Sequence, residues 1–148
     1  MAGATDLFEA DILDILFTNV AAPNIGTAGG LLATAPPGDV SISLHTATIT
    51  DTATVQTLSE AAYTGYVRQT AARAGAQWTI SGTAPTIAAN DVAITYPIST
   101  SGPESELDVG IGLNAGVMQI YSVLDATLVV NNGVTPEFAI AALAISLD

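Results

Sequence analysis

The chain contains no lysine, and its only side chains with a fixed positive charge are Arg68 and Arg73. Fourteen acidic residues oppose these two arginines, which gives a formal net charge of -12. A protein that binds nucleic acid or an anionic membrane needs a basic face that neutralises phosphate groups. Two arginines cannot supply such a face. The composition therefore predicts that neither nucleic acid nor a membrane is a partner.

Cysteine is also absent, so the sequence allows neither a disulfide nor a thiolate metal site. No apolar run reaches the roughly 18 residues of a transmembrane helix, and the start of the chain lacks the basic region of a secretory signal. Gly26, Gly29 and Gly30 do not have the spacing of a phosphate loop, and no lysine follows them. We expect no cofactor and no metal.

Charge of either sign is scarce, because only 11% of the residues are charged whereas 49% are hydrophobic. Ordinary soluble domains carry about 25% charged residues. Much of the surface must therefore consist of small and weakly polar side chains, which suits a protein covered by neighbours in an assembly. The length of 148 residues predicts a single domain.

The first 19 residues are typical of a short helix. Asp6 is a candidate N-cap, and Glu9 follows it at the spacing of a capping box. Leu7 and Phe8 begin an apolar series that we expect to face the core, with the acidic residues turned to solvent. The next segment, residues 20–38, is rich in alanine, glycine and proline and predicts an extended arm or loop.

From residue 39 onwards the hydrophobic period changes to two. Residues 40–45 alternate between aliphatic side chains and Ser41, Ser43 and His45, which predicts a half-buried strand. Further strands are predicted at residues 66–72, 77–81, 92–96, 108–113, 118–124, 127–130 and 138–147, the last of them buried on both faces. The turn at residues 114–116 and the others are rich in glycine and asparagine. We predict a mainly β fold, with residues 39–148 forming an antiparallel β-sandwich or jelly roll after the short helix and the extended arm.

Two groups of residues could carry chemistry. His45 is the only histidine, and the sequence contains no G-x-S-x-G nucleophile motif. We therefore interpret His45 as an ordinary surface or interface residue rather than a catalytic base. Glu104, Glu106 and Asp108 recur at strand spacing and present hard oxygen ligands of the kind that calcium uses. They form no compact ligand loop, and we favour a solvated rim over a calcium site.

Aromatic residues are few, and three of them, Tyr63, Tyr66 and Trp78, lie close in sequence to the two arginines. Tyr63, Tyr66, Arg68 and Arg73 are candidate interface residues, because aromatic and arginine side chains often anchor interfaces. Each arginine either bridges to a carboxylate of another subunit or is a plain surface residue. In the segment 20–38, the apolar residues Ile25, Leu31 and Leu32 are candidates for burial against a neighbour.

Six short sequence blocks follow one another along the chain in a recognisable order. They are LDILF at residues 13–17, LHTA at 44–47, GYVRQ at 65–69, ITYP at 94–97, VGI at 109–111 and LD at 147–148. In this order the chain resembles a family of small virion proteins of tailed bacteriophages, whose members are described as tail fibre proteins or as capsid decoration (cement) proteins. The resemblance covers nearly the whole sequence. The loops around residues 112–115 and 136–138 depart from the family pattern.

The resemblance implies a structural virion protein rather than an enzyme. As the main expectation, the chain is a capsid decoration protein on the exterior of the phage shell, a homo-oligomer, most simply a trimer, that binds the major capsid protein. The segment 20–38 would then reach onto the shell or a sister subunit. The alternative is a tail fibre or tail-tip protein that acts in host receptor binding.

Overall fold

The computed structural model describes residues 4–26, 29–83, 85–113 and 116–147. The chain forms two compact units. The first unit comprises Met1–Gly38, Ala72–Ile94 and Phe138–Asp148, and the second comprises Asp39–Ala71 and Thr95–Glu137. The single-domain organisation, with borders at residues 19 and 38, stays a prediction, although Gly38 also ends the first segment of the first unit.

The first unit begins with a short helix that continues into a π-helical turn. The helix α1 spans Asp6–Leu13, and the π-helix η1 follows at Asp14–Thr18. Thr5, not the expected Asp6, is the N-cap, because its side chain accepts a hydrogen bond from the Phe8 amide at 3.4 Å. Asn19 ends the helical segment in the left-handed conformation, with φ 56°.

Much of α1 is oriented differently from the prediction, although the apolar Leu13 at its end is buried. Leu7 and Phe8 are exposed, whereas Glu9 and Asp11 are buried. Glu9 accepts a hydrogen bond from the Thr86 hydroxyl at 3.0 Å, and Asp11 accepts one from the Asn24 amide at 3.0 Å. These hydrogen bonds replace those that the two carboxylates lose to water on burial, so the hydrophobic pattern alone does not decide which residues of α1 are buried.

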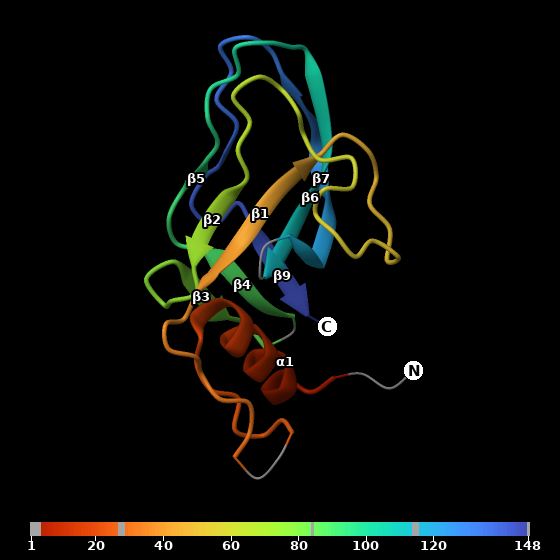
Figure 1. The fold of residues 1–148 in the computed structure, drawn as a ribbon. Coiled ribbons are helices and arrows are strands. Elements are labelled where there is room, and N and C mark those ends of the chain that lie inside the picture. Colours follow the sequence, from red (N-terminus) through yellow and green to blue (C-terminus); the bar gives the residue numbers. More distant parts are fainter. Residues whose placement is uncertain (1–3, 27–28, 84, 114–115, 148) are drawn as a thin grey trace. The chain divides into compact units, whose positions relative to one another are not determined.

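A three-stranded antiparallel sheet completes the first unit. Its order is β3-β4-β9, with bounds Trp78–Ser81, Thr86–Asn90 and Ala144–Leu147. Helix α1 packs against β4, as Figure 1 shows, and η1 packs against β3. The rings of Phe17 and Trp78 lie 4.7 Å apart at the centre of this packing. Strand β4 was not predicted, because three of its five residues are alanine or asparagine, which are depleted in strands.

The segment 20–38 is more folded than the expected arm. Ala22 and Leu31 form an isolated antiparallel bridge with amide-to-carbonyl distances of 2.8 and 2.9 Å. Asn19 holds the returning chain through both the amide and the carbonyl of Thr34. The segment therefore doubles back on itself instead of reaching away from the first unit.

The expected strand at residues 138–147 is wrong in its extent. Only Glu137–Phe138 (β8) and Ala144–Leu147 (β9) are strands, and β8 pairs with the two-residue β5, Ile94–Thr95. Between β8 and β9, Ala141 adopts φ 62° and breaks the strand. The Asn90 side chain organises this break by donating to Ala139 and accepting from Leu143, both at 2.9 Å.

The second unit is built on a four-stranded antiparallel sheet with the order β2-β1-β6-β7. The strands span Gln69–Ala72, Asp39–His45, Glu104–Leu113 and Val117–Val130. They lie side by side in Figure 1. The prediction of a mainly β fold with antiparallel sheets and one short N-terminal helix is confirmed, while the jelly-roll arrangement stays a prediction. The turn expected at residues 114–116 lies mostly outside the described residues.

The pairing of β1 with β6 gives the sheet one apolar face and one polar face. Ile42 lies opposite Ile111 and Leu44 opposite Val109 on the apolar face, and all four are buried. Ser41, Ser43 and His45 lie opposite Gly112, Gly110 and Asp108 on the polar face. The alternation of apolar and polar side chains is therefore correct for β1, but the expected half-burial is wrong, because Ser43 and His45 on the polar face are buried as well.

Candidate functional site

The polar face of the sheet is covered by the segment between β1 and β2. Val55 forms a bridge with Val117, and Glu60 forms one with His45, so the segment is fastened at both ends. Glycine in β6 makes room for it. A Cβ atom on Gly110 would lie 2.6 Å from His45 Nε2 and 2.7 Å from Met118 Sδ. Because Gly110 has no side chain, there is room beside β6 for the buried ring of His45.

His45, Ser43 and Gln56 form a hydrogen-bonded network on this face, and none of the three is exposed. His45 Nδ1 lies 2.8 Å from the Leu58 carbonyl, which can only accept. The neutral ring is therefore protonated on Nδ1, and its Nε2 accepts from the Ser43 hydroxyl at 2.8 Å. Gln56 Nε2 donates to Ser43 Oγ at 3.0 Å and to the Ser41 carbonyl at 2.9 Å.

The burial of His45 corrects the interpretation as a surface or interface residue. Burial lowers the pKa of the imidazole, against the raising effect of the Leu58 carbonyl and of the nearby carboxylates Glu60 and Asp108. A histidine and a serine at hydrogen-bond distance could suggest nucleophilic catalysis. However, no part of either side chain reaches solvent, so this pair fastens the covering segment and offers no surface to a substrate.

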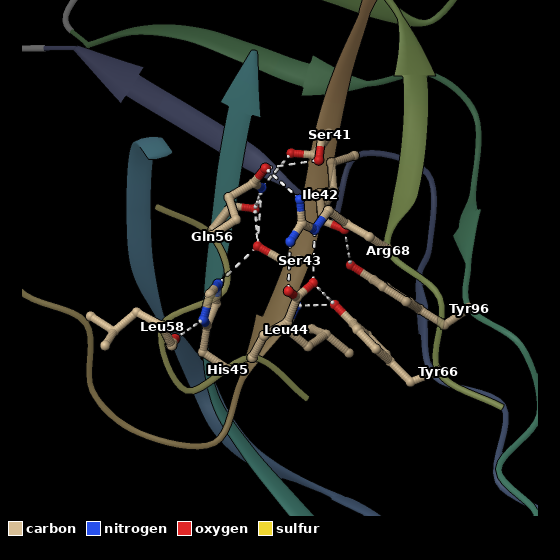
Figure 2. A network of polar contacts seen from close by, with 12 residues as sticks. Ser41, Ile42, Ser43, Leu44, His45, Gln56, Leu58, Tyr66, Arg68 and Tyr96 are labelled. Carbon is tan, nitrogen blue, oxygen red and sulfur yellow. Dashed lines mark hydrogen bonds and ion pairs between the residues drawn. The ribbon is translucent and has the colours of Figure 1, made fainter. Parts of the chain in front are cut away.

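An arginine-carboxylate pair extends the network to the other side of β1. Arg68 donates to Glu60 through Nε at 2.7 Å and through a terminal nitrogen at 2.5 Å, which is the two-pronged geometry of a strong ion pair. A third donor reaches Gln56 at 3.4 Å. Figure 2 shows Gln56 and His45 on one side of β1, and Tyr66 and Tyr96 on the other. The network therefore connects the covering segment with β1.

Three tyrosines pack together beside this ion pair. The rings of Tyr66 and Tyr96 stack at 6.0 Å, and Tyr63 meets Tyr66 edge-on at 5.3 Å. Tyr66 donates to Glu60 at 3.0 Å and accepts from the Leu44 amide at 3.1 Å. Burial raises the pKa of all three phenols, that of Tyr63 to about 12. The phenols therefore keep their protons. Tyr63 and Tyr96 donate to backbone carbonyls, whereas Tyr66 donates to Glu60 and accepts from a backbone amide.

The three carboxylates of β6 do not form the expected solvated rim. Glu106 and Asp108 are completely buried, and the pairing with β7 shifts register between them. Asp108 accepts a hydrogen bond from the Ile49 amide at 2.7 Å. Glu104 accepts from the amides of Ala62 and Tyr63 at 2.8 and 2.9 Å. Glu104 and Asp108 therefore fasten neighbouring loops, and the register shift between Glu106 and Asp108 gives the carboxylates different surroundings.

Within the described ranges, no three histidine, cysteine or acidic side chains are grouped so that they could hold a metal ion. Among the same residues, no helix has both the length and the apolar character that a membrane span requires.

A family model matches residues 3–146 of the 148, and its description is Podophage GP4 fiber I protein gp80. The chain belongs to this family. No curated protein matches the sequence. The match covers both compact units, and it establishes the chain as a structural protein of a phage fibre family. It supports the virion resemblance seen in the sequence, and it favours the fibre alternative over capsid decoration.

In this fibre-family chain, the seven candidate interface residues fall into two groups. Leu31 and Leu32 are exposed and Ile25 is partly exposed, so the segment 20–38 offers apolar side chains to a neighbour. The other four residues are engaged within the chain. They are Tyr63, Tyr66, Arg68 and Arg73. Their roles between subunits stay predictions.

Arg73 is bonded to the end of the helical segment of its unit. Its guanidinium donates to the carbonyls of Leu16 at 2.8 Å, Pro37 at 2.9 Å and Ile15. A cation at the carboxyl end of a helix is favourable because unpaired carbonyls gather there. This placement was not foreseen, because the sequence gives no sign of which carbonyls an arginine will meet.

The outer edge of β7 is the exposed surface that sequence reasoning missed. Strand β7 is fourteen residues long and lies at the edge of its sheet. Among the residues that the structure describes, bridges and backbone hydrogen bonds cover only its start, through Val55 and through the Thr54 carbonyl, which accepts from the Met118 amide at 3.1 Å. Beyond that point Tyr121, Val123 and Val129 are exposed. The sequence suggested two strands here, which concealed the length of the edge.

Proposed function

We propose that the chain is a building block of a podophage virion fibre and has a structural role, not a catalytic one. The observation that carries this proposal is the family match over residues 3–146. The position on the virion, next to the tail and not over the capsid shell, is the finer part of the proposal. Host receptor binding by the assembled fibre is its expected purpose.

Self-association is part of the same proposal, and the outer edge of β7 supports it. An uncovered edge strand presents unpaired amides and carbonyls that another strand can complete. Natural edge strands are usually short or carry lysine or proline, which discourage such pairing. Strand β7 contains neither residue, and Asp125 is its only charge. In a chain of net charge -12, this edge is a place where two copies meet with little electrostatic repulsion.

The charge of the chain supports the absence of nucleic acid and membrane from its partners. Both arginines donate hydrogen bonds to groups of the same chain, Arg68 to Glu60 and Arg73 to backbone carbonyls. Little positive charge is left for phosphate groups. The expected partners are other virion proteins and copies of the same chain.

Immunogold labelling of purified particles, combined with the copy number of the chain per particle, tests the position. We expect label near the tail and far fewer copies than of the major capsid protein, which serves as the internal standard. Label spread over the whole shell, with a copy number close to that of the capsid protein, would instead support a decoration protein bound to the major capsid protein.

Receptor binding has a separate test. Cells are incubated with the purified protein before phage is added, and free phage is then counted. We expect slower adsorption with the native protein and none of this inhibition with the heat-denatured protein. Unchanged adsorption at saturating protein would restrict the role to building the fibre.

A further inference from the structure

Glu106 on β6 has a carboxyl group in an unusual environment. Its side chain is completely buried, and neither of its oxygens receives a hydrogen bond from a donor among the residues that the structure describes. Glu9, which is also buried, accepts a hydrogen bond from Thr86. A buried carboxylate without donors is costly, and such a group responds by keeping its proton.

The titratable groups around Glu106 add negative charge and no positive charge. Glu104 lies two residues earlier on the same strand. Tyr63 and Tyr96 lie near enough for the charge of Glu106 to raise their pKa values. Both phenols donate to backbone carbonyls, those of Pro97 and Ile42, each at 3.3 Å.

The strand β7 contributes only apolar residues here, since Leu128 lies opposite Glu106 and Val130 opposite Glu104. Arg68, the cation of the same unit, is bonded to Glu60 and Gln56.

We propose that Glu106 is protonated in the folded chain at neutral pH and shares this proton with Glu104, so that the pair forms a pH-sensitive latch between β6 and the segment at residues 61–64. Glu104 connects the two elements, because one of its oxygens binds the amides of both Ala62 and Tyr63. A proton between the two carboxyls turns a repulsion into a hydrogen bond. Loss of the proton places two negative charges side by side on one strand and weakens the attachment of the segment.

The pKa of Glu106 supports this geometry. Burial, followed by the hydrogen bond with Glu104 and the charge repulsion from it, raises the pKa of Glu106 to about 8 from the ordinary 4.5. Between these two values the folded chain keeps a proton that the unfolded chain releases. The stabilisation is therefore complete below about pH 4.5, falls as the pH rises, and is lost above about pH 8. One such proton changes the unfolding equilibrium constant by up to about tenfold per pH unit.

Chemical unfolding of the purified full chain between pH 5 and pH 9 tests the latch with three proteins. They are the wild type, Glu106→Gln, which is neutral at every pH and similar in shape, and Asp125→Asn, which removes an exposed carboxyl of β7. We expect the unfolding equilibrium constant of the wild type to rise with pH relative to that of Glu106→Gln, by up to about tenfold per unit. Asp125→Asn should keep the wild-type dependence. Equal pH dependence in all three proteins would overturn the proposal.

A second measurement needs no folded variant. The infrared spectrum of the wild type at pH 6.5 should contain the carbonyl band of one protonated carboxyl, and this band should disappear with a midpoint near pH 8. A spectrum without that band at pH 6.5 would show that Glu106 is ionised and would reject the shared proton. Glu104→Gln sharpens the assignment, because removing the adjacent negative charge should shift the midpoint to lower pH.

Discussion

The two arginines of the chain lie five positions apart and stabilise different units in different ways. Arg68 meets a carboxylate in the second unit, where Glu60 is only 15% exposed and also binds Tyr66. Arg73 meets backbone carbonyls in the first unit, at the end of the helical segment. Removing the first leaves a charge unpaired, whereas removing the second leaves dipoles that water can satisfy. The two arginines are therefore expected to contribute unequally to the free energy of unfolding.

The largest expected effect on stability comes from the close packing of β6 against β7 and the covering segment in the second unit. A Cβ atom on Gly112 would collide with the Val117 carbonyl and with the Gln56 side chain. We predict that Gly112→Ala lowers the free energy of unfolding by about 3 kcal/mol, because a backbone carbonyl cannot move aside. Gly75→Ala in the first unit is the control, since its Cβ would meet nothing within 4 Å. Denaturant titration measures both, and equal stabilities would show that the polar face is loosely packed.

The next effect is that of the ion pair itself. Arg68→Met should cost about 2 kcal/mol, since it leaves the Glu60 carboxylate mostly buried and without its cation. The double variant Arg68→Met/Glu60→Gln should recover part of this loss, because it removes the unpaired charge. A double variant less stable than the single one would indicate that the contact with Tyr66, and not the charge, makes Glu60 important.

Arg73→Met should have a smaller effect, about 1 kcal/mol, which is typical of a cation at a helix end. The fluorescence of Trp78, whose ring packs on Phe17 of η1, reports on this unit. We expect an earlier unfolding transition in this signal. A loss as large as that of Arg68→Met would contradict the unequal contributions of the two arginines.

The smallest effect is the pH dependence that His45 contributes. Because burial lowers its pKa below 6.5, the unfolded chain binds a proton more readily than the folded chain. Stability from this residue is therefore present above pH 6.5 and is lost as the pH falls below it. His45→Gln should unfold with less sensitivity to acid than the wild type between pH 7 and pH 5. If both lose stability in parallel over this range, the histidine does not titrate differently on folding.

The sequence was sufficient for features that depend on a local pattern. The alternation in β1, the mainly β fold and the end of the helical segment at Asn19 all follow from side-chain period or turn chemistry. It was insufficient wherever a distant partner decided the outcome. Glu9 is buried because Thr86 supplies a donor 77 positions away. No local pattern carries such information.

The same reason explains the errors in the candidate site. A histidine that alternates with serines predicts a polar, exposed position. Its burial depends on the glycines of β6 and on the segment that covers the sheet. The three carboxylates of β6 share a spacing in the sequence, but the register shift after Glu106 gives them separate surroundings. Pairing between distant segments determines the burial of His45 and the surroundings of the carboxylates. The hydrophobic period of a single sequence does not reveal this pairing.

The hydrogen bonds of the two arginines also determine how the chain meets proteases. Trypsin cleaves after lysine or arginine, so in these 148 residues it has two target bonds, which follow Arg68 and Arg73. Both guanidinium groups are held by other groups of the fold, and Gln69 directly after the first begins β2. Cleavage therefore requires local opening of a unit, and the cleavage rate at each arginine measures how often that unit opens. In digested virions the chain should yield few tryptic peptides, so a count of its copies needs a protease with another specificity.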